Sequence, residues 1–211
     1  MMQSLPTTRA SVADSDWRWR GLVVPVFVMC IALFISIQPA RALDLRTVLD
    51  NTAVVPPAQV GFKEERHNPI FEEPMLLTGR LEYLASGILR KVIETPFEED
   101  ILIQADHVVV ARDGKTRKLA LNRSRALKTI LGAIESILSG DSDELEAAFH
   151  CELSGTEDAW ALQMTPISRS VAKRISKLEV QGDNHTVTSI RINLQDDEWH
   201  LMRITRNNLA P

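Results

Sequence analysis

Short runs that mix apolar and polar residues, separated by Pro, Gly, Asn and Asp, make up much of the chain between residues 58 and 122. An alternation with a period of two is typical of β-strands that are buried on one face. Residues 76–84 alternate around Leu81 and Tyr83, and further strand signals lie at 60–66, 88–95 and 100–111, the last as one bent strand or two short strands. Asp113 and Gly114 then predict a hairpin turn, with a returning strand at 118–122.

The pattern changes to a helical period after residue 124. Apolar side chains recur three and four positions apart, at Leu127, Ile130, Leu131, Ile134, Ile137 and Leu138. This spacing places them along one face of an α-helix. Ser124 is a suitable N-cap and Gly140 a suitable C-terminal stop, so we expect one amphipathic helix between them. Leu145 and Phe149, four residues apart, predict a second short helix.

Strand signals resume in the last third of the chain, at residues 158–164, 175–181, 185–194 and 199–205. A short helix capped by Asp44 is expected before all the strands, because Pro56 and Pro57 end it. Strands and helices come in runs rather than in alternation, so the expected fold class is α+β with an antiparallel sheet. The helical stripe must cover the apolar face of that sheet. The pattern by itself favours a filled core over an internal cavity.

The N-terminal region has three parts in a fixed order. Residues 17–20 carry two arginines, residues 21–37 are uncharged and mostly apolar, and an Ala-x-Ala pattern ends at Ala42. This order is typical of a secretory signal peptide, with cleavage between Ala42 and Leu43. We therefore expect a signal peptide at 1–42 and one domain at 43–211. An uncleaved anchor is the alternative, because the apolar run is near the shortest membrane-spanning length of about 17 residues.

Charge narrows the possible partners. The whole chain has a net charge of −4, and the first 42 residues hold four of its 24 basic and two of its 28 acidic residues, which leaves −6 on residues 43–211. An acidic protein is not steered to nucleic acid or to an anionic membrane surface. We expect a monomer that meets a small or apolar ligand, or a protein partner, and binds no nucleic acid.

Sequence motifs for catalysis and for binding nucleotides or metals are absent. Asp106 and His107 are adjacent, and neighbours in a strand point to opposite faces, so we do not expect them to act together. Cys151 is the one cysteine after residue 42 and is expected to be a small buried hydrophobe rather than a nucleophile. We therefore expect no enzyme activity, no metal and no cofactor.

A series of short spaced patterns runs through the domain. They are Phe62-x-Glu64-x-Arg66, Pro74 with Gly79, Leu81 and Tyr83, Leu89-Arg90, Pro96, Asp113 to Lys115, Ile137 to Asp141, Trp160 with Leu162 and Pro166, and Ile175 with Leu178, Val180, Gly182 and Asp183. Their order and spacing, over about residues 62–204, resemble the LolA-like family of periplasmic outer-membrane lipoprotein carriers, in a divergent branch.

The resemblance implies an incomplete antiparallel β-barrel, a strongly curved sheet covered by a helical lid, with a cavity that takes acyl chains. It implies a non-catalytic carrier that shields the acyl chains of a lipoprotein or another lipid amphiphile in the periplasm of a Gram-negative bacterium. Delivery toward the outer membrane implies transient contacts with an inner-membrane donor and an outer-membrane acceptor. The residues expected to face the ligand are Leu81, Tyr83, Ile101, Ile103, Leu127, Ile130, Leu131, Ile134, Ile137, Leu138, Trp160 and Leu162.

Two departures from the main branch of the family mean that the resemblance does not identify the molecule that is carried. The main branch has an Arg-Pro pair that helps to hold the lid shut, and residues 84–87 contain neither residue. The chain also ends at Pro211 without the C-terminal extension of the main branch. We therefore expect a lid held mainly by apolar contacts, unless Arg66 or Arg90 supplies a charged latch. Other open functions are an accessory protein or enzyme acting on lipids or polyene lipids, and a β-rich scaffold without a cavity.

Overall fold

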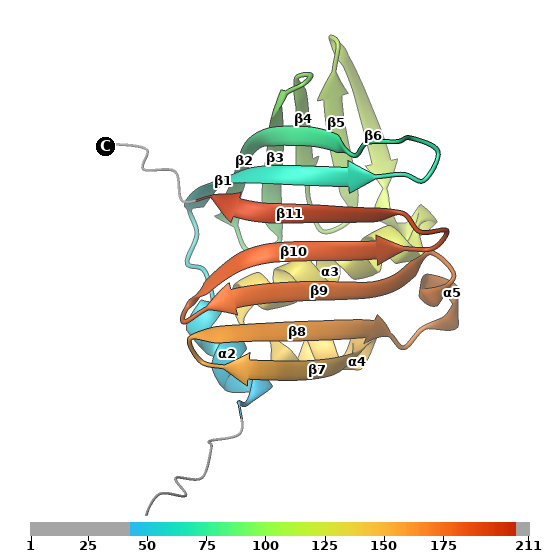
Figure 1. The fold of residues 1–211 in the computed structure, drawn as a ribbon. Helices are drawn as coiled ribbons and strands as arrows, with labels where there is room; N and C mark the ends of the chain where they lie inside the picture. Colours follow the sequence, from blue (N-terminus) through green and yellow to red (C-terminus); the bar gives the residue numbers. More distant parts are fainter. Residues whose placement is uncertain (1–42, 206–211) are drawn as a thin grey trace, which may run out of the picture. The chain divides into compact units, whose positions relative to one another are not determined.

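A computed structural model describes residues 43–205, so the expected signal peptide at 1–42 lies outside the described residues. The described chain forms one sheet of eleven antiparallel strands in the order β6-β5-β4-β3-β2-β1-β11-β10-β9-β8-β7 (Figure 1). The strands are β1 Ala58–His67, β2 Met75–Ala85, β3 Ile88–Thr95, β4 Glu99–Ile103, β5 His107–Arg112, β6 Lys115–Ala120, β7 Phe149–Thr156, β8 Ala159–Pro166, β9 Ile175–Asp183, β10 Thr186–Leu194 and β11 Trp199–Thr205. The order starts at β6 and ends at β7, so the curved sheet stays open, and the predicted α+β incomplete barrel is confirmed.

The helices lie on the inner face of this sheet (Figure 1). They are α2 Leu45–Thr52, the short 3₁₀ helix η1 Leu121–Arg123, α3 Arg125–Ser139, α4 Ser142–Ala148 and α5 Arg169–Ala172. Among the residues that the structure describes, no helix is long and apolar enough to cross a membrane.

The ends of α3 follow from its two flanking residues. The Ser124 side chain accepts a hydrogen bond from the backbone N–H of Leu127 at 3.3 Å. This bond satisfies one of the free N–H groups of the first turn. Gly140 ends the helix with a φ of +79°, a conformation that glycine adopts without steric cost. The amphipathic helix predicted between these two residues is therefore observed.

The sequence pattern missed one strand. Phe149 was expected to belong to a helix, but its backbone is extended, and it starts β7 opposite Pro166. The side chains of Phe149, Cys151 and Leu153 alternate along β7 toward the core, where Phe149 is fully buried. The second half of this strand is exposed and runs through Ser154 and Gly155, so its sequence carries little strand signal.

The interior is filled on one side. A large cluster of buried side chains joins α2, α3 and α4 to strands β7–β10, with Leu49, Ala133, Ile137, Trp160 and Leu162 among its members. A smaller cluster of Phe62, Leu77 and Ile93 lies between β1, β2 and β3. The helices thus fill the half of the sheet that ends at β7, and the space between the two clusters holds the candidate site.

Candidate functional site: an apolar cavity beside helix α3

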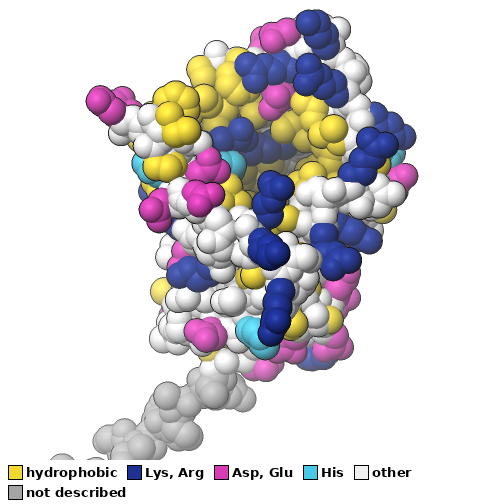
Figure 2. Space-filling view, turned by 90° about the vertical axis from the view of Figure 1, so that its right-hand side faces the viewer, with side chains coloured by type: hydrophobic (Ala, Val, Ile, Leu, Met, Phe, Trp, Pro, Cys, Tyr) yellow, Lys and Arg dark blue, Asp and Glu magenta, His cyan; other side chains and the backbone are white. Residues whose placement is uncertain are grey.

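A cavity of about 510 Å³ lies between α3 and the inner face of strands β1–β4, β10 and β11. This volume is within the range typical of sites for small molecules and lipids. Figure 2 shows a hollow surrounded by hydrophobic side chains, with Lys and Arg side chains in it and beside it. The apolar lining includes Val54, Val60, Leu81, Leu89, Ile103, Leu131, Ile134, Leu138, Val187, Ile190, Ile192, Met202 and Ile204. The filled core that the sequence pattern by itself favoured is therefore not observed in this region.

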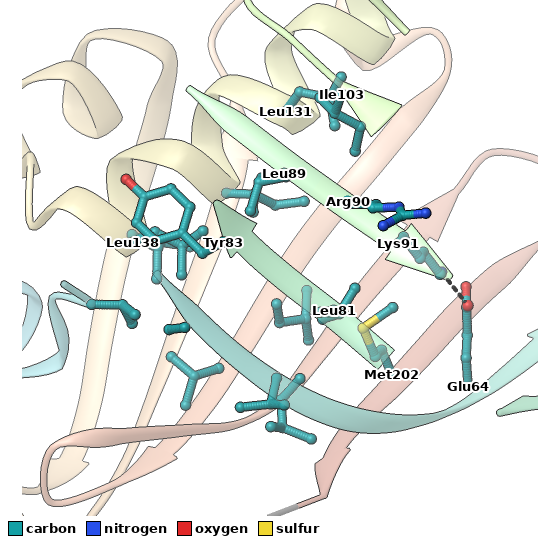
Figure 3. A pocket seen from close by; sticks show the side chains of 18 of the residues that line it. Glu64, Leu81, Tyr83, Leu89, Arg90, Lys91, Ile103, Leu131, Leu138 and Met202 are labelled. Atoms are coloured by element: carbon teal, nitrogen blue, oxygen red, sulfur yellow. Dashed lines mark hydrogen bonds and ion pairs between the residues drawn. The ribbon is translucent and has the colours of Figure 1, made fainter. Parts of the chain in front are cut away.

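The cavity brings together eight of the twelve residues expected to face a ligand. These are Leu81, Tyr83, Ile103, Ile130, Leu131, Ile134, Ile137 and Leu138. Register explains the strand positions, because Leu81 and Tyr83 are two residues apart and share the inner face of β2. The opposite face of the same strand carries Glu82, which pairs with Arg80 at 2.8 Å. Figure 3 shows Leu81, Tyr83, Leu131 and Leu138 around the pocket.

The other four expected residues lie elsewhere. Trp160 and Leu162 are buried in the filled half and do not line the cavity. Ile101 packs against the smaller cluster. Leu127 belongs to a separate groove between the first turn of α3 and residues 170–175. Helix α3 therefore extends beyond the cavity at this end.

Sequence reasoning missed a charged group that lies inside the cavity. The Glu64 carboxylate is 4% exposed and forms ion pairs with Lys91 and with Arg66, the latter at 3.0 Å (Figure 3). His200 Nδ1 lies 3.9 Å from the same carboxylate. The Lys91 ammonium also lies 4.8 Å from the centre of the Phe62 ring. Lys91 could have been found from the alternation, because it lies two residues from the inward-facing Leu89.

Burial and neighbouring charges shift the pKa values of Glu64, Lys91 and His200. Burial raises the pKa of Glu64, but the positive charges of Lys91 and Arg66 outweigh burial and hold that pKa below its usual value. Burial lowers the pKa of Lys91, against the opposing effect of Glu64. Burial, followed by the charge of Arg66, lowers the pKa of His200 and favours its neutral form near pH 7.

Arg90 forms ion pairs with other partners than its neighbour Lys91 does. Its guanidinium donates to Asp100 from Nε at 2.9 Å and pairs with Glu82 at 3.5 Å. Glu82 and Asp100 are the strand neighbours of Arg90 on the face opposite to Lys91. Arg90 therefore belongs to an ion-pair network across β2, β3 and β4, and neither it nor Arg66 bonds to the lid helix.

A polar contact from Glu135 joins α3 to the sheet, in addition to the apolar contacts that were expected to hold the lid. The Glu135 carboxylate accepts hydrogen bonds from the Gly87 backbone N–H at 2.8 Å, from Tyr83 Oη at 3.1 Å and from Ser86 Oγ at 3.3 Å. Burial and the charge of Glu135 raise the pKa of Tyr83 and keep it a donor. We call these contacts the Glu135 latch. This latch contacts residues 84–87, the segment that lacks the Arg-Pro pair. Its charged side chain, Glu135, comes from the helix and not from the sheet.

Groups that resemble catalytic residues lie away from the cavity. Asp106 and His107 do form a hydrogen bond, because Asp106 precedes β5, and here the expectation from strand alternation was wrong. Neither residue lines the cavity. Burial raises the pKa of the Cys151 thiol to about 11, which keeps it protonated and unreactive. In the described part of the chain, no three His, Cys, Asp or Glu side chains are grouped to hold a metal ion.

Several solved structures are similar to this chain. Three solved structures similar to this chain are the LolA superfamily protein NE2245 from Nitrosomonas europaea, a chain of the MucA/MucB complex of Pseudomonas aeruginosa, and the lipoprotein LppX of Mycobacterium tuberculosis. Their sequence identities are 14%, 16% and 9%, their TM-scores are each 0.41, and they align with 81%, 80% and 79% of this chain. The aligned parts are 96%, 59% and 97% of those chains.

The sequence comparison is more specific. None of the curated protein sequences compared with this chain matches it. The family described as outer membrane lipoprotein carrier protein LolA-like matches residues 37–200, which is most of the chain. The open sheet, the inner helices and this match agree, and the chain belongs to the LolA-like family.

Proposed function

We propose that this protein is a non-catalytic carrier that shields the acyl chain of a lipoprotein or another lipid amphiphile from water. The observation that supports the proposal most strongly is the apolar cavity of about 510 Å³ between α3 and the sheet. Removing an acyl chain from water is favourable by about 0.8 kcal/mol for each CH₂ group buried. A cavity lined by Leu, Ile, Val and Met can supply that environment without forming a covalent bond.

The proposal includes a place of action. Residues 1–42 are proposed to be a signal peptide that is cleaved after Ala42, so that the carrier works in the periplasm of a Gram-negative bacterium as a monomer. Membership of a family of outer membrane lipoprotein carriers supports this location. Delivery toward the outer membrane then requires transient contacts with an inner-membrane donor and an outer-membrane acceptor.

Binding of a fluorescent fatty acid to residues 43–211 tests the proposal. The matched variants are Ile134→Trp, which fills the cavity with a large side chain, and Leu119→Trp, which adds the same side chain at an exposed position on β6. We expect saturable binding to the parent protein and to Leu119→Trp, and binding at least about tenfold weaker to Ile134→Trp. Equal binding by all three proteins, or no binding by the parent, would overturn the proposal.

A further inference from the structure

The charge of the cavity is opposite in sign to the charge of the protein. The chain as a whole has a net charge of −4. Among the described residues that line the cavity, Glu64 is the one carboxylate, whereas Arg66, Arg90 and Lys91 are cationic. Asp100 and Glu82 pair with Arg90 on the other face of the sheet. The remaining group of Glu64, Arg66 and Lys91 therefore carries a net charge of +1.

This positive group occupies one side of the cavity. Figure 3 shows Glu64 and Lys91 on one side of the pocket, and Tyr83 and Leu138 on the opposite side. The helix α3 contributes apolar side chains to the lining. The cavity is thus amphipathic, with a charged end and an apolar end. A lipid with one polar head group and one acyl chain has the same distribution of polar and apolar groups. A filled apolar core would have no use for two partly buried cations, because burying a charge is costly.

Arg66 and Lys91 have more N–H donors than their bonds to Glu64 use, so donors remain for a ligand. Glu64 accepts from two nitrogens of Arg66, Nε at 3.0 Å and Nη2 at 3.4 Å. A guanidinium carries five N–H donors and an ammonium three. The Arg66 side chain is 30% exposed and the Lys91 side chain 14% exposed, so both are shielded but accessible from the cavity. Hydrogen bonds from such groups to an anion are short and strong.

We propose that Arg66 and Lys91 bind the anionic head group of the carried amphiphile, a phosphate or a carboxylate, while its acyl chain lies along α3. Glu64 holds the two cations in place and keeps a net charge of +1 at this end. The inference rests on the proposed carrier function and adds the chemical class of the head group, so the cavity selects anionic amphiphiles over neutral and cationic ones.

Calorimetric binding of four amphiphiles with the same twelve-carbon chain tests this selection, each below its micelle concentration. They are dodecyl phosphate, dodecanoate, dodecylphosphocholine and dodecyltrimethylammonium. The parent protein should bind one or both anions at least about tenfold more tightly than the other two, the gain expected from one charge-assisted hydrogen bond. The affinities for dodecyl phosphate and for dodecanoate show which of the two anionic head groups is preferred.

Two matched variants locate the effect. Arg66→Gln should lose most of the preference for anions, and Arg203→Gln should retain it, because Arg203 is an exposed cation that pairs with Glu65 on the outer face. Equal binding of all four amphiphiles to the parent would overturn the inference and leave the carrier function standing. Binding of none would overturn both. The comparison in the parent protein holds even if Arg66→Gln fails to fold.

Discussion

At the scale of single residues, the cavity depends on Glu64. This carboxylate is 4% exposed and lies between Lys91 and Arg66, so its charge offsets two cations that would otherwise be buried together. Breaking one side of a buried ion pair is strongly destabilising, because the other charge remains without a partner. Glu64 therefore links the electrostatics of the cavity to the stability of the sheet.

The pH dependence of stability follows from the lowered pKa of Glu64. A carboxyl whose pKa is lower in the folded state stabilises the fold above its unfolded pKa of about 4.5, and this stabilisation is lost as the pH falls through the folded pKa. We expect Glu64→Gln to be less stable than the parent at pH 7 by about 3 kcal/mol. The difference should shrink below pH 4.5, as measured by urea unfolding.

The control is Glu73→Gln, in the exposed loop between β1 and β2. It should match the parent at every pH. A difference between Glu64→Gln and the parent that stays constant from pH 7 to pH 3 would contradict this account of Glu64.

The Glu135 latch gives a second prediction for a single residue. Glu135→Ala removes the acceptor of three hydrogen bonds and leaves the Gly87 N–H and Tyr83 Oη without it. We expect the empty protein to open more readily and to bind the dye ANS more strongly, with a loss of stability of about 1–3 kcal/mol. Glu146→Ala, on the exposed side of α4, should change neither quantity. Unchanged ANS binding by Glu135→Ala would show that the latch does not hold the lid.

At the scale of elements, the contact between β8 and β9 requires a glycine. Trp160 lies opposite Gly182, and a Cβ atom at Gly182 would come within 2.1 Å of the Trp160 ring. Gly182→Ala should therefore destabilise the protein by about 1–3 kcal/mol, through displacement of the buried indole.

Gly132 in α3 is the matched control, because a Cβ atom there would meet nothing within 4 Å. Gly132→Ala should be neutral or stabilise the helix by up to about 1 kcal/mol. Thermal unfolding of both variants measures the difference. Similar stabilities for the two would contradict the close approach of Trp160 to β9.

Helix α3 has two faces with different roles. Leu131 lines the cavity, whereas Ala133 is buried in the core shared with β7–β10. Leu131→Glu should abolish binding of a fluorescent fatty acid while the circular dichroism spectrum stays that of the folded protein, because its charge can meet water entering an empty cavity. Ala133→Glu should unfold the protein, since its charge has no such access. Unfolding by both variants would indicate that α3 is core throughout and not a lid.

The elements could be predicted from the sequence more completely than the site. Pro96 marks the end of the strand at residues 88–95, and Ser124 and Gly140 mark the ends of α3, so local patterns were sufficient there. The placement of Trp160 in the filled core and of Leu131 in the cavity depends on which side of α3 faces which half of the sheet. That information comes from strand order, which periodicity does not contain.

The charged group at Glu64 was missed for a similar reason. Residues 62–66 contain four charged side chains, and charged side chains are rarely buried, so the sequence gives no sign that Glu64 lies in a cavity. Only the pairing of β1 with β2 and β11, and of β2 with β3, brings Lys91 and His200 to Glu64. Long-range pairing thus decides whether a charge is solvated or lies in a cavity.

At the scale of the whole molecule, one half of the open barrel is filled and the other half is hollow. The helices α2, α3 and α4 pack with β7–β10, and this filled half supports α3 without occupying the cavity. A carrier needs this division, because the fold must remain stable both when the cavity is empty and when it is occupied. The central claim is therefore that the hollow half holds a lipid.

Native mass spectrometry of the protein, released gently from the envelope of a Gram-negative host, tests that claim most directly. The account predicts a species heavier than residues 43–211 by the mass of one amphiphile, which dissociates as an anion with an acyl chain. The Ile134→Trp variant, with its cavity filled, should carry no such mass. Protein that is ligand-free in every preparation, and that takes up no lipid when exposed to envelope extracts, would contradict the account.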